Sequence, residues 1–396
     1  MNIFLVGNGF DLYHGLPTKY ENFLHTMEYI IDHKDKDFAQ FPVGMIFYLM
    51  SIDKKDKFIE QVYKNHKKLY DEIYFENNDF GKISFLLKNR WLRYFIDSFN
   101  KDLGWIDFEK EIAFVLRNLS CLLESAGVSE ENAKVFSDFD YFFEVVDSKS
   151  GDFQAENNIK IYDKYVDNSP YNFNKYKPNK EKISDELFEH LQGLMCLLKL
   201  YLKYFVEKPL SANTDEYWIS SAFGKADYLV DFNYTNTFEK IYNIGNDKCF
   251  HLHGTVDGKI VLGINPDEKD ELMDLNTVFI KFKKYYQRIV NRTDNDYQNF
   301  IKSLKEANNK FKTLSNSNTI NVIVAGHSLD RTDEDIIKEL FDYANRIIIL
   351  CHNDQVIGQY ITNLITIYGK SAFDDLRSSK NLEFISYKGL DSLLKS

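Results

Sequence analysis

Four short segments of the sequence carry polar or ionisable side chains, three of them together with glycine, and each directly follows a run of apolar residues. Their sequences are GNGFDLYHGLP (residues 7–17), DFNYT (231–235), HLHG (251–254) and GHSLD (326–330). Continuous apolar runs are typical of buried parallel strands, and open α/β sheets hold ligands beyond the carboxyl ends of such strands. We therefore expect the four segments to meet at one edge of a sheet and to form a ligand site.

The first segment opens with Gly7, Asn8 and Gly9. Glycines just past a buried strand let the backbone approach a diphosphate closely, and the helix that follows presents its free amide groups to the anion. On this interpretation, Gly9→Val abolishes ligand binding but leaves the stability of the ligand-free protein nearly unchanged. A purely structural turn is the alternative.

The third segment contains two histidines, His251 and His253, two positions apart. On an extended segment both side chains point to the same side, so they could bind a metal ion if Asp11 or His327 converged on them. The sequence shows no third ligand at a recognisable spacing, and we therefore expect no metal.

A largely parallel sheet is needed to position these segments. Five apolar runs predict its buried strands, namely residues 3–6, 228–230, 322–325, 347–350 and 382–385. Helical patterns separate the last three runs, and strands that alternate with helices form parallel crossovers. The predicted fold class is α/β, with a Rossmann-like sheet.

Long amphipathic helices are predicted within a large insertion into this sheet. Apolar spacing predicts one helix over residues 108–122 and another over 187–205, the second ended by Pro209. We divide the chain into a Rossmann-like nucleotide-binding core and a mostly helical insertion domain, formed by residues 1–30 with 216–396 and by residues 31–215.

The composition narrows the class of protein. Of the 396 residues, 44 % are hydrophobic and 16 % aromatic, which supplies a large packed core. The net charge of -11 argues against nucleic acid as the main partner. No two of the four cysteines form a CxxC pair, which argues against a structural zinc knuckle. The first residues lack a basic region and charges interrupt the longer apolar runs, so we expect a cytoplasmic protein without a membrane partner.

The ordered segments resemble the blocks of a known family. The opening GNGFDLYHGLP is followed by Tyr20 and Phe23, and later come WIDFE (105–109), FNYT (232–235), HLHG (251–254) and GHSL (326–329). In this order they resemble the AbiH abortive-infection family of phage defence. The resemblance implies a bacterial antiviral protein, with a phage-derived trigger among its partners.

A more distant likeness is to the sirtuins, which carry GAGxS, GIP, an asparagine loop, His-Gly and Gly-Thr-Ser in this order. The resemblance implies a sirtuin-like Rossmann core that binds NAD. The implied dinucleotide cradle consists of Gly7, Asn8, Gly9, Asp11, Gly326, His327 and Ser328. Asn233 and His253 would then face the nicotinamide ribose as the catalytic pair.

Two departures from the sirtuin pattern affect the implied activity. Thr235 stands where sirtuins have an acid, and Asp11 stands where they have a serine. Because a carboxylate beside a diphosphate is unfavourable, Asp11 is expected to cap the helix or to bind a ribose. The sirtuin zinc module is also absent, so the likeness favours hydrolysis of the dinucleotide over protein deacetylation.

The implied reaction is hydrolysis of NAD to nicotinamide and ADP-ribose. It needs a group that takes a proton, for which histidine is suited, and a group that holds the ribose or the water, for which an asparagine amide is suited. Two other functions remain open, a nucleotide-sensing module that does not cleave its ligand and a metal-assisted phosphoesterase or nuclease. NADP in place of NAD and assembly into a homo-oligomer are also open.

Overall fold

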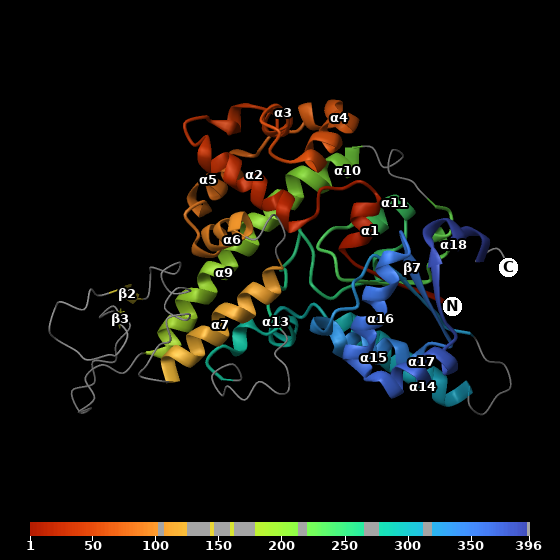
Figure 1. Ribbon diagram of the computed structural model, residues 1–396. Helices are drawn as coiled ribbons and strands as arrows, with labels where there is room; N and C mark the ends of the chain where they lie inside the picture. Colours follow the sequence, from red (N-terminus) through yellow and green to blue (C-terminus); the bar gives the residue numbers. More distant parts are fainter. Residues whose placement is uncertain are drawn as a thin grey trace. The chain divides into compact units, whose positions relative to one another are not determined.

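The structure is a computed structural model that describes residues 1–101, 107–124, 143–145, 159–161, 179–212, 220–264, 277–311 and 319–393 (Figure 1). The chain forms two compact units. Unit 1 comprises residues 1–80, 198–261 and 288–396, and unit 2 comprises residues 81–197 and 262–287. The main sheet and the four polar segments, residues 7–17, 231–235, 251–254 and 326–330, belong to unit 1.

The main sheet has six strands, all parallel, in the order β5-β4-β1-β6-β7-β8. The strands are β1 (Asn2–Val6), β4 (Tyr228–Asp231), β5 (Cys249–His251), β6 (Asn321–Ala325), β7 (Arg346–Cys351) and β8 (Leu382–Ser386). The prediction of an α/β protein with a parallel sheet is confirmed, and each of the five predicted strands agrees with an observed one to within a residue at either end. The apolar runs are continuous because helices bury both faces of the central strands.

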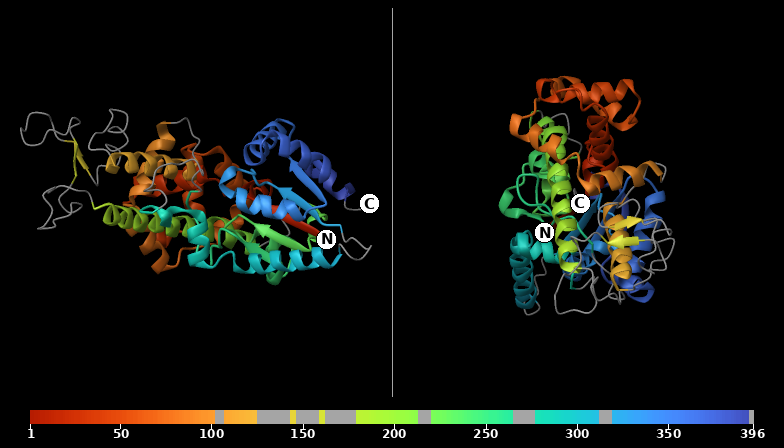
Figure 2. Two further views of the ribbon diagram at one scale, coloured as in Figure 1. Left: turned by 90° about the horizontal axis from the view of Figure 1, so that it is seen from below. Right: turned by 90° about the vertical axis from the view of Figure 1, so that its left-hand side faces the viewer.

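Side chains alternate between the two covered faces of the sheet. Ile3 and Leu5 pack in one core with Tyr297 of α14, whereas Phe4 contacts Phe238 of α11 on the other face, with ring centroids 5.7 Å apart. The first face is covered by α14 (Asn295–Phe311), α15 (Glu334–Tyr343), α16 (Gln355–Tyr368) and α17 (Lys370–Ser379). The second face meets α1 (Asn8–Tyr13), α11 (Thr237–Tyr242) and α18 (Tyr387–Leu393). Figure 2 shows helices on both sides of these strands.

The strand order reverses direction at β1. From β1 the chain adds β4 and β5 on one side, then β6, β7 and β8 on the other. Ligands of open α/β sheets bind at such a switch point, beyond the carboxyl ends of the strands. Two of the segments directly follow β1 and β6, and the other two begin with the last residue of β4 and of β5. The expectation that the four segments share this edge is therefore confirmed.

The remaining helices of unit 1 belong to the N-terminal part of the chain and to the long helix before β4. They are α2 (Tyr20–Asp32), α3 (Gly44–Ile52), α4 (Lys57–Asp71) and α10 (Lys208–Ala212). The predicted helix end at Pro209 is wrong. A π-helical turn, Lys203–Glu207, continues the chain into α10, and the Phe205 carbonyl, four residues before Pro209, accepts the Tyr70 hydroxyl at 2.8 Å in place of the N–H that proline lacks.

Unit 2 is mainly helical where it is described. Its elements include α6 (Arg90–Lys101), α7 (Phe108–Glu124), most of α9 (Lys180–Leu202) and a small antiparallel pair, β2 (Phe143–Val145) and β3 (Ile159–Ile161), while α5 (Asn77–Leu86) and α13 (Lys284–Asn291) cross the unit boundaries. Trp105 and Ile106 of the WIDFE block lie outside the described residues. Asp107 caps α7 by accepting the backbone N–H groups of Glu109 and Lys110 at 3.1 and 3.2 Å.

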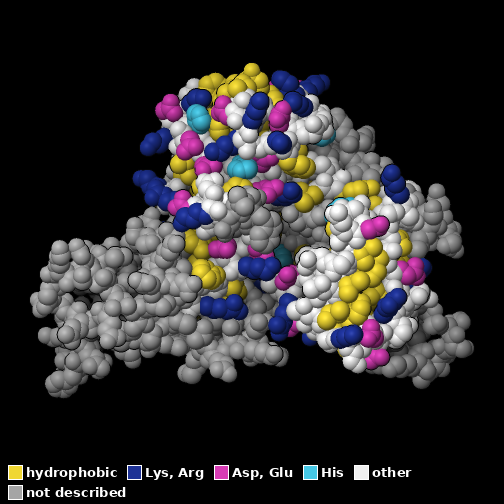
Figure 3. All heavy atoms as spheres, viewed as in Figure 1, with side chains coloured by type: hydrophobic (Ala, Val, Ile, Leu, Met, Phe, Trp, Pro, Cys, Tyr) yellow, Lys and Arg dark blue, Asp and Glu magenta, His cyan; other side chains and the backbone are white. Residues whose placement is uncertain are grey.

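The surface over α3 and α4 carries charges of both signs. Figure 3 shows Lys and Arg side chains interspersed there with Asp and Glu, so this described part of the surface has no unbroken basic stripe. Among the residues that the structure describes, no helix has the length and apolar composition needed to cross a membrane.

Candidate functional site

The loops after β1 and β6 pack directly on each other through their glycines. Gly9 N–H donates to the carbonyl of Gly326 at 2.8 Å. A Cβ on Gly9 would lie 2.8 Å from Cα of Gly326, and a Cβ on Gly7 would lie 2.7 Å from Cα of His327. The geometry therefore does not support the expectation that Gly9→Val spares the ligand-free protein, because the added side chain would push the two loops apart.

Asn8 and Ser328 lie on the outside of these two loops. Asn8 is exposed and its Oδ1 accepts the Thr18 hydroxyl at 2.5 Å. Ser328 is exposed too, and its carbonyl accepts from Asn363 Nδ2 at 2.9 Å. Of the predicted cradle, these two residues are the ones most accessible to solvent.

Asp11, by contrast, is buried beneath the loop and only 1 % exposed. Its Oδ2 accepts the Thr235 hydroxyl at 2.6 Å, and its Oδ1 has no hydrogen-bond partner among the described residues. The suggested capping role is wrong, because Gly7 is the cap of α1 and no side chain bonds to it there. Burial raises the pKa of Asp11 to about 7, although the Thr235 and Thr237 hydroxyls lower it.

Asp11 should make the protein less stable as pH rises. Its folded pKa exceeds the usual 3.8, so between about pH 4 and about pH 7 the unfolded chain loses a proton that the folded chain keeps. Burial lowers the pKa of His14 from 6.5 to about 4, so His14 has the opposite effect over nearly the same range. Asp11→Asn should therefore raise the free energy of unfolding more at about pH 8 than at about pH 5.

Urea unfolding at both pH values measures this difference. His14→Gln is the matched control, because it removes the opposing dependence and should make the loss of stability with rising pH steeper. An Asp11→Asn variant with the same gain at both pH values would show that Asp11 does not titrate in this range.

His253 is held on both ring nitrogens and is 5 % exposed. Its Nδ1 lies 3.1 Å from the Phe232 carbonyl, and its Nε2 lies 3.1 Å from Oδ1 of Asp333. A carbonyl only accepts, so Nδ1 carries a hydrogen. The Nε2 then faces a carboxylate, so a proton taken up by the pair would lie between these two atoms.

His327 reaches the same carboxylate from the other side. Its Nδ1 accepts the Leu329 N–H at 2.9 Å, so Nε2 carries the hydrogen and faces Oδ2 of Asp333 at 3.6 Å. Asp333 therefore lies between two imidazoles, at the end of the 3-10 turn η8 (Arg331–Asp333). Asp333 was not among the predicted site residues, since an acid within DRTDED (330–335), at the start of a helix, is usually a capping residue.

Asn233 follows Phe232 in the segment after β4. Its backbone N–H donates to Asp231 at 2.7 Å, and its side-chain Nδ2 is buried without a hydrogen-bond partner among the residues described. The adjoining Phe232 ring contacts both imidazoles, with centroids 5.2 Å from His253 and 4.2 Å from His327. The structure thus brings His253 and His327 together on one aromatic ring, and Asn233 is the next residue along that segment.

His251 is separated from His253. Strand β5 ends at His251, and His253 lies in the turn that follows, so the expectation that both side chains point to one side is wrong. His251 Nε2 contacts Glu239, and its Nδ1 lies 3.8 Å from Asp231. Burial alone would lower the pKa of His251, but the two carboxylates raise it to about 9.

Comparison with known proteins gives one match. The sequence model of the family described as "Bacteriophage abortive infection AbiH" matches residues 3–351, a range that contains all four polar segments. A comparison with curated proteins finds no match, and a comparison with solved structures finds none either. Because the match covers well over half of its residues, the chain belongs to the AbiH family of bacteriophage abortive infection proteins.

Proposed function

We propose that this phage-defence protein has a sirtuin-like core and hydrolyses NAD to nicotinamide and ADP-ribose. The observation that carries the proposal is the pair of His253 and Asp333 beyond the carboxyl ends of the strands, at the switch point of the parallel sheet. Asn233, in the segment after β4, has a buried amide without a hydrogen-bond partner among the described residues, and a ribose hydroxyl would satisfy it. The His253–Asp333 pair supplies a proton acceptor.

The contact between Asp11 and Thr235 also supports a sirtuin-like core. Asp11 replaces a serine of the sirtuin pattern and Thr235 replaces an acid, and here the two side chains are hydrogen-bonded. The two positions thus carry one acid and one hydroxyl both in the sirtuin pattern and in this chain, but with the two groups exchanged. Two departures that looked independent in the sequence form a single reciprocal substitution.

In the proposed reaction a water oxygen attacks C1′ of the nicotinamide ribose while the bond from C1′ to nicotinamide breaks. The electron pair of that bond leaves with neutral nicotinamide, and a proton of the water passes to the His253–Asp333 pair. Asn233 would hold the ribose or the water in line. A carboxylate at the site also favours the positive charge that develops on the ribose.

The proposed cradle for the dinucleotide is the pair of loops after β1 and β6. Gly7 and Gly9 face Gly326 and His327 across the loop contact, while Asn8 and Ser328 are exposed for contact with a ligand. Asp11 is too deeply buried to bind a ribose directly, and we assign it to support of the Thr235 loop.

Product analysis tests the proposal. Purified protein is incubated with NAD, alone and with extract from phage-infected cells as a source of the trigger, and the products are separated by chromatography. Release of nicotinamide and ADP-ribose is expected. Release of AMP and nicotinamide mononucleotide would instead show phosphoesterase chemistry, and would overturn the proposal.

Dinucleotide sensing without cleavage is the second candidate. It is favoured by one observation, that both ring nitrogens of His253 are already engaged. Saturable binding of NAD by calorimetry, with no product formed under either condition above, would establish sensing in place of hydrolysis.

A further inference from the structure

Three ionisable side chains from three elements converge beneath α11. Asp231 ends β4, His251 ends β5 as its register partner, and Glu239 lies in the first turn of α11. One oxygen or nitrogen atom from each lies within 4.8 Å of the other two. Neither Glu239 nor His251 takes part in the proposed NAD chemistry.

Two atoms of this cluster are buried without a hydrogen-bond partner among the described residues. They are Oε2 of Glu239, whose side chain is 9 % exposed, and Nδ1 of His251. A buried polar atom that makes no hydrogen bond costs about 1–3 kcal/mol, and more when it is charged. Such atoms in one cluster point to a missing partner with positive charge.

The surrounding charges leave an excess of acid. Asp231 is 1 % exposed, and burial together with the neighbouring Glu239 and Asp11 raises its pKa, against the effect of His251. Glu207 also lies close to Asp11, but Lys240 pairs with it. Three acids, Asp231, Glu239 and Asp11, thus lie near one another. His251 is the base that contacts Asp231 and Glu239.

We propose that Asp231, Glu239 and His251 bind a divalent first-row transition metal ion, with Zn²⁺ as the reference. One imidazole nitrogen and two carboxylate oxygens are a donor set that zinc and manganese accept, and three protein ligands leave positions open for water. Asp231 is oriented for this role, because its Oδ1 already accepts the Asn233 N–H. The site is separate from the proposed NAD site in its ligands.

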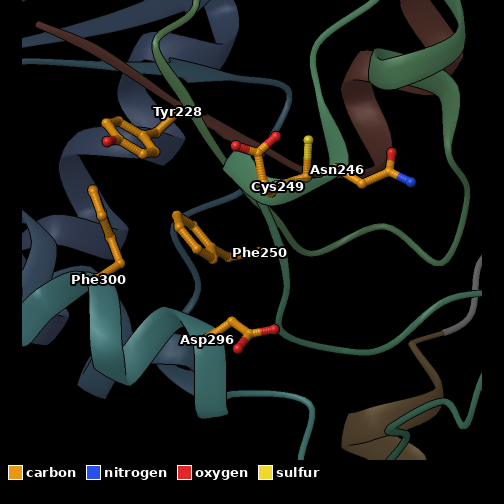
Figure 4. A pocket seen from close by; sticks show the side chains of 7 residues that line it. Tyr228, Asn246, Cys249, Phe250, Asp296 and Phe300 are labelled. Atoms are coloured by element: carbon orange, nitrogen blue, oxygen red, sulfur yellow. The ribbon is translucent and has the colours of Figure 1, made fainter.

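A pocket lies at the edge of the sheet beside β5, the strand that ends at His251. The pocket measures about 460 Å³ and is lined by Cys249, Asp247 and Asp296 together with the aromatic rings shown in Figure 4. The Cys249 thiol also interacts with Glu239, and burial and the nearby carboxylates raise its pKa. Cys249 therefore lines the pocket and also contacts one ligand of the proposed ion site, and acids near the pocket attract cations.

Titration with the metal alone tests the proposal. Full-length protein is stripped with a chelator, and Zn²⁺ and Mn²⁺ are added separately in a calorimeter, with bound metal measured after dialysis. We expect saturable binding of one ion per chain and a rise in the melting temperature. Glu239→Gln and His251→Gln should each weaken binding at least about 10-fold.

His25→Gln is the matched control, because His25 also contacts a buried carboxylate, Asp56 at 2.9 Å, but no third His, Cys, Asp or Glu completes a ligand group there among the described residues. It should bind metal as the unaltered protein does. No saturable binding by the unaltered protein, or an affinity in both ligand variants equal to that of the unaltered protein, would overturn the proposal. Loss of binding in Cys249→Ser alone would place the ion on the thiol and overturn it too. None of these readouts depends on NAD turnover.

Discussion

Alanine at Asn233 or at His253 should slow the release of nicotinamide from NAD by about 10²–10⁴-fold. His253→Ala removes the proton acceptor that Asp333 orients, and Asn233→Ala removes the buried amide that would hold the ribose or water. The affinity for NAD should change little, because the two loops of the proposed cradle are left intact. Single-turnover kinetics and calorimetry measure the two quantities separately.

Asp333 should act as a positioning residue in this reaction. Asp333→Asn keeps the size of the side chain but removes the carboxylate that faces both imidazoles, so it should lower kcat and alter the pH profile with little change in KM. A merely structural role would leave the pH profile unchanged.

His33→Ala is a control for loss of a histidine elsewhere, since the His33 ring is hydrogen-bonded to the Tyr29 carbonyl and stacks on the Tyr29 ring of its own helix. Its turnover should match that of the unaltered protein. Full turnover by both Asn233→Ala and His253→Ala would remove these side chains from the mechanism.

Gly326→Ala should destabilise the whole of unit 1. Gly326 has a φ of +71°, and a Cβ there would lie 2.0 Å from the backbone nitrogen of Phe10. Left-handed strain and overpacking each cost about 1–3 kcal/mol, so the expected loss in the free energy of unfolding is about 2–6 kcal/mol. Chemical denaturation measures it.

Gly369→Ala separates the two causes of this loss. Gly369 has nearly the same φ, +77°, but no atom lies within 4 Å of an added Cβ. Its ψ of 158° places it in a backbone region that is essentially restricted to glycine, so the variant should lose only the strain, about 1–3 kcal/mol. Equal losses for the two variants would mean that the loops after β1 and β6 are not in tight contact.

The sequence alone determined the sheet and the edge at which the site lies. Five apolar runs are continuous because both faces of the sheet are covered, so an unbroken apolar pattern in the sequence indicates each buried strand. The polar segments that follow β1, β4 and β6 then had to share the carboxyl edge. Asn233 and His253 were predicted as candidate site residues for this reason, together with their place in a family pattern.

Which groups pair within the site was decided only by the tertiary structure. Asp333 contacts His253 across 80 residues of sequence, and Asp11 contacts Thr235 across 224. Local patterns report periodicity and burial, but they carry no signal for a hydrogen bond between distant loops. The separation of His251 from His253 has the same origin, because the end of β5 after His251 directs two nearby side chains to different partners.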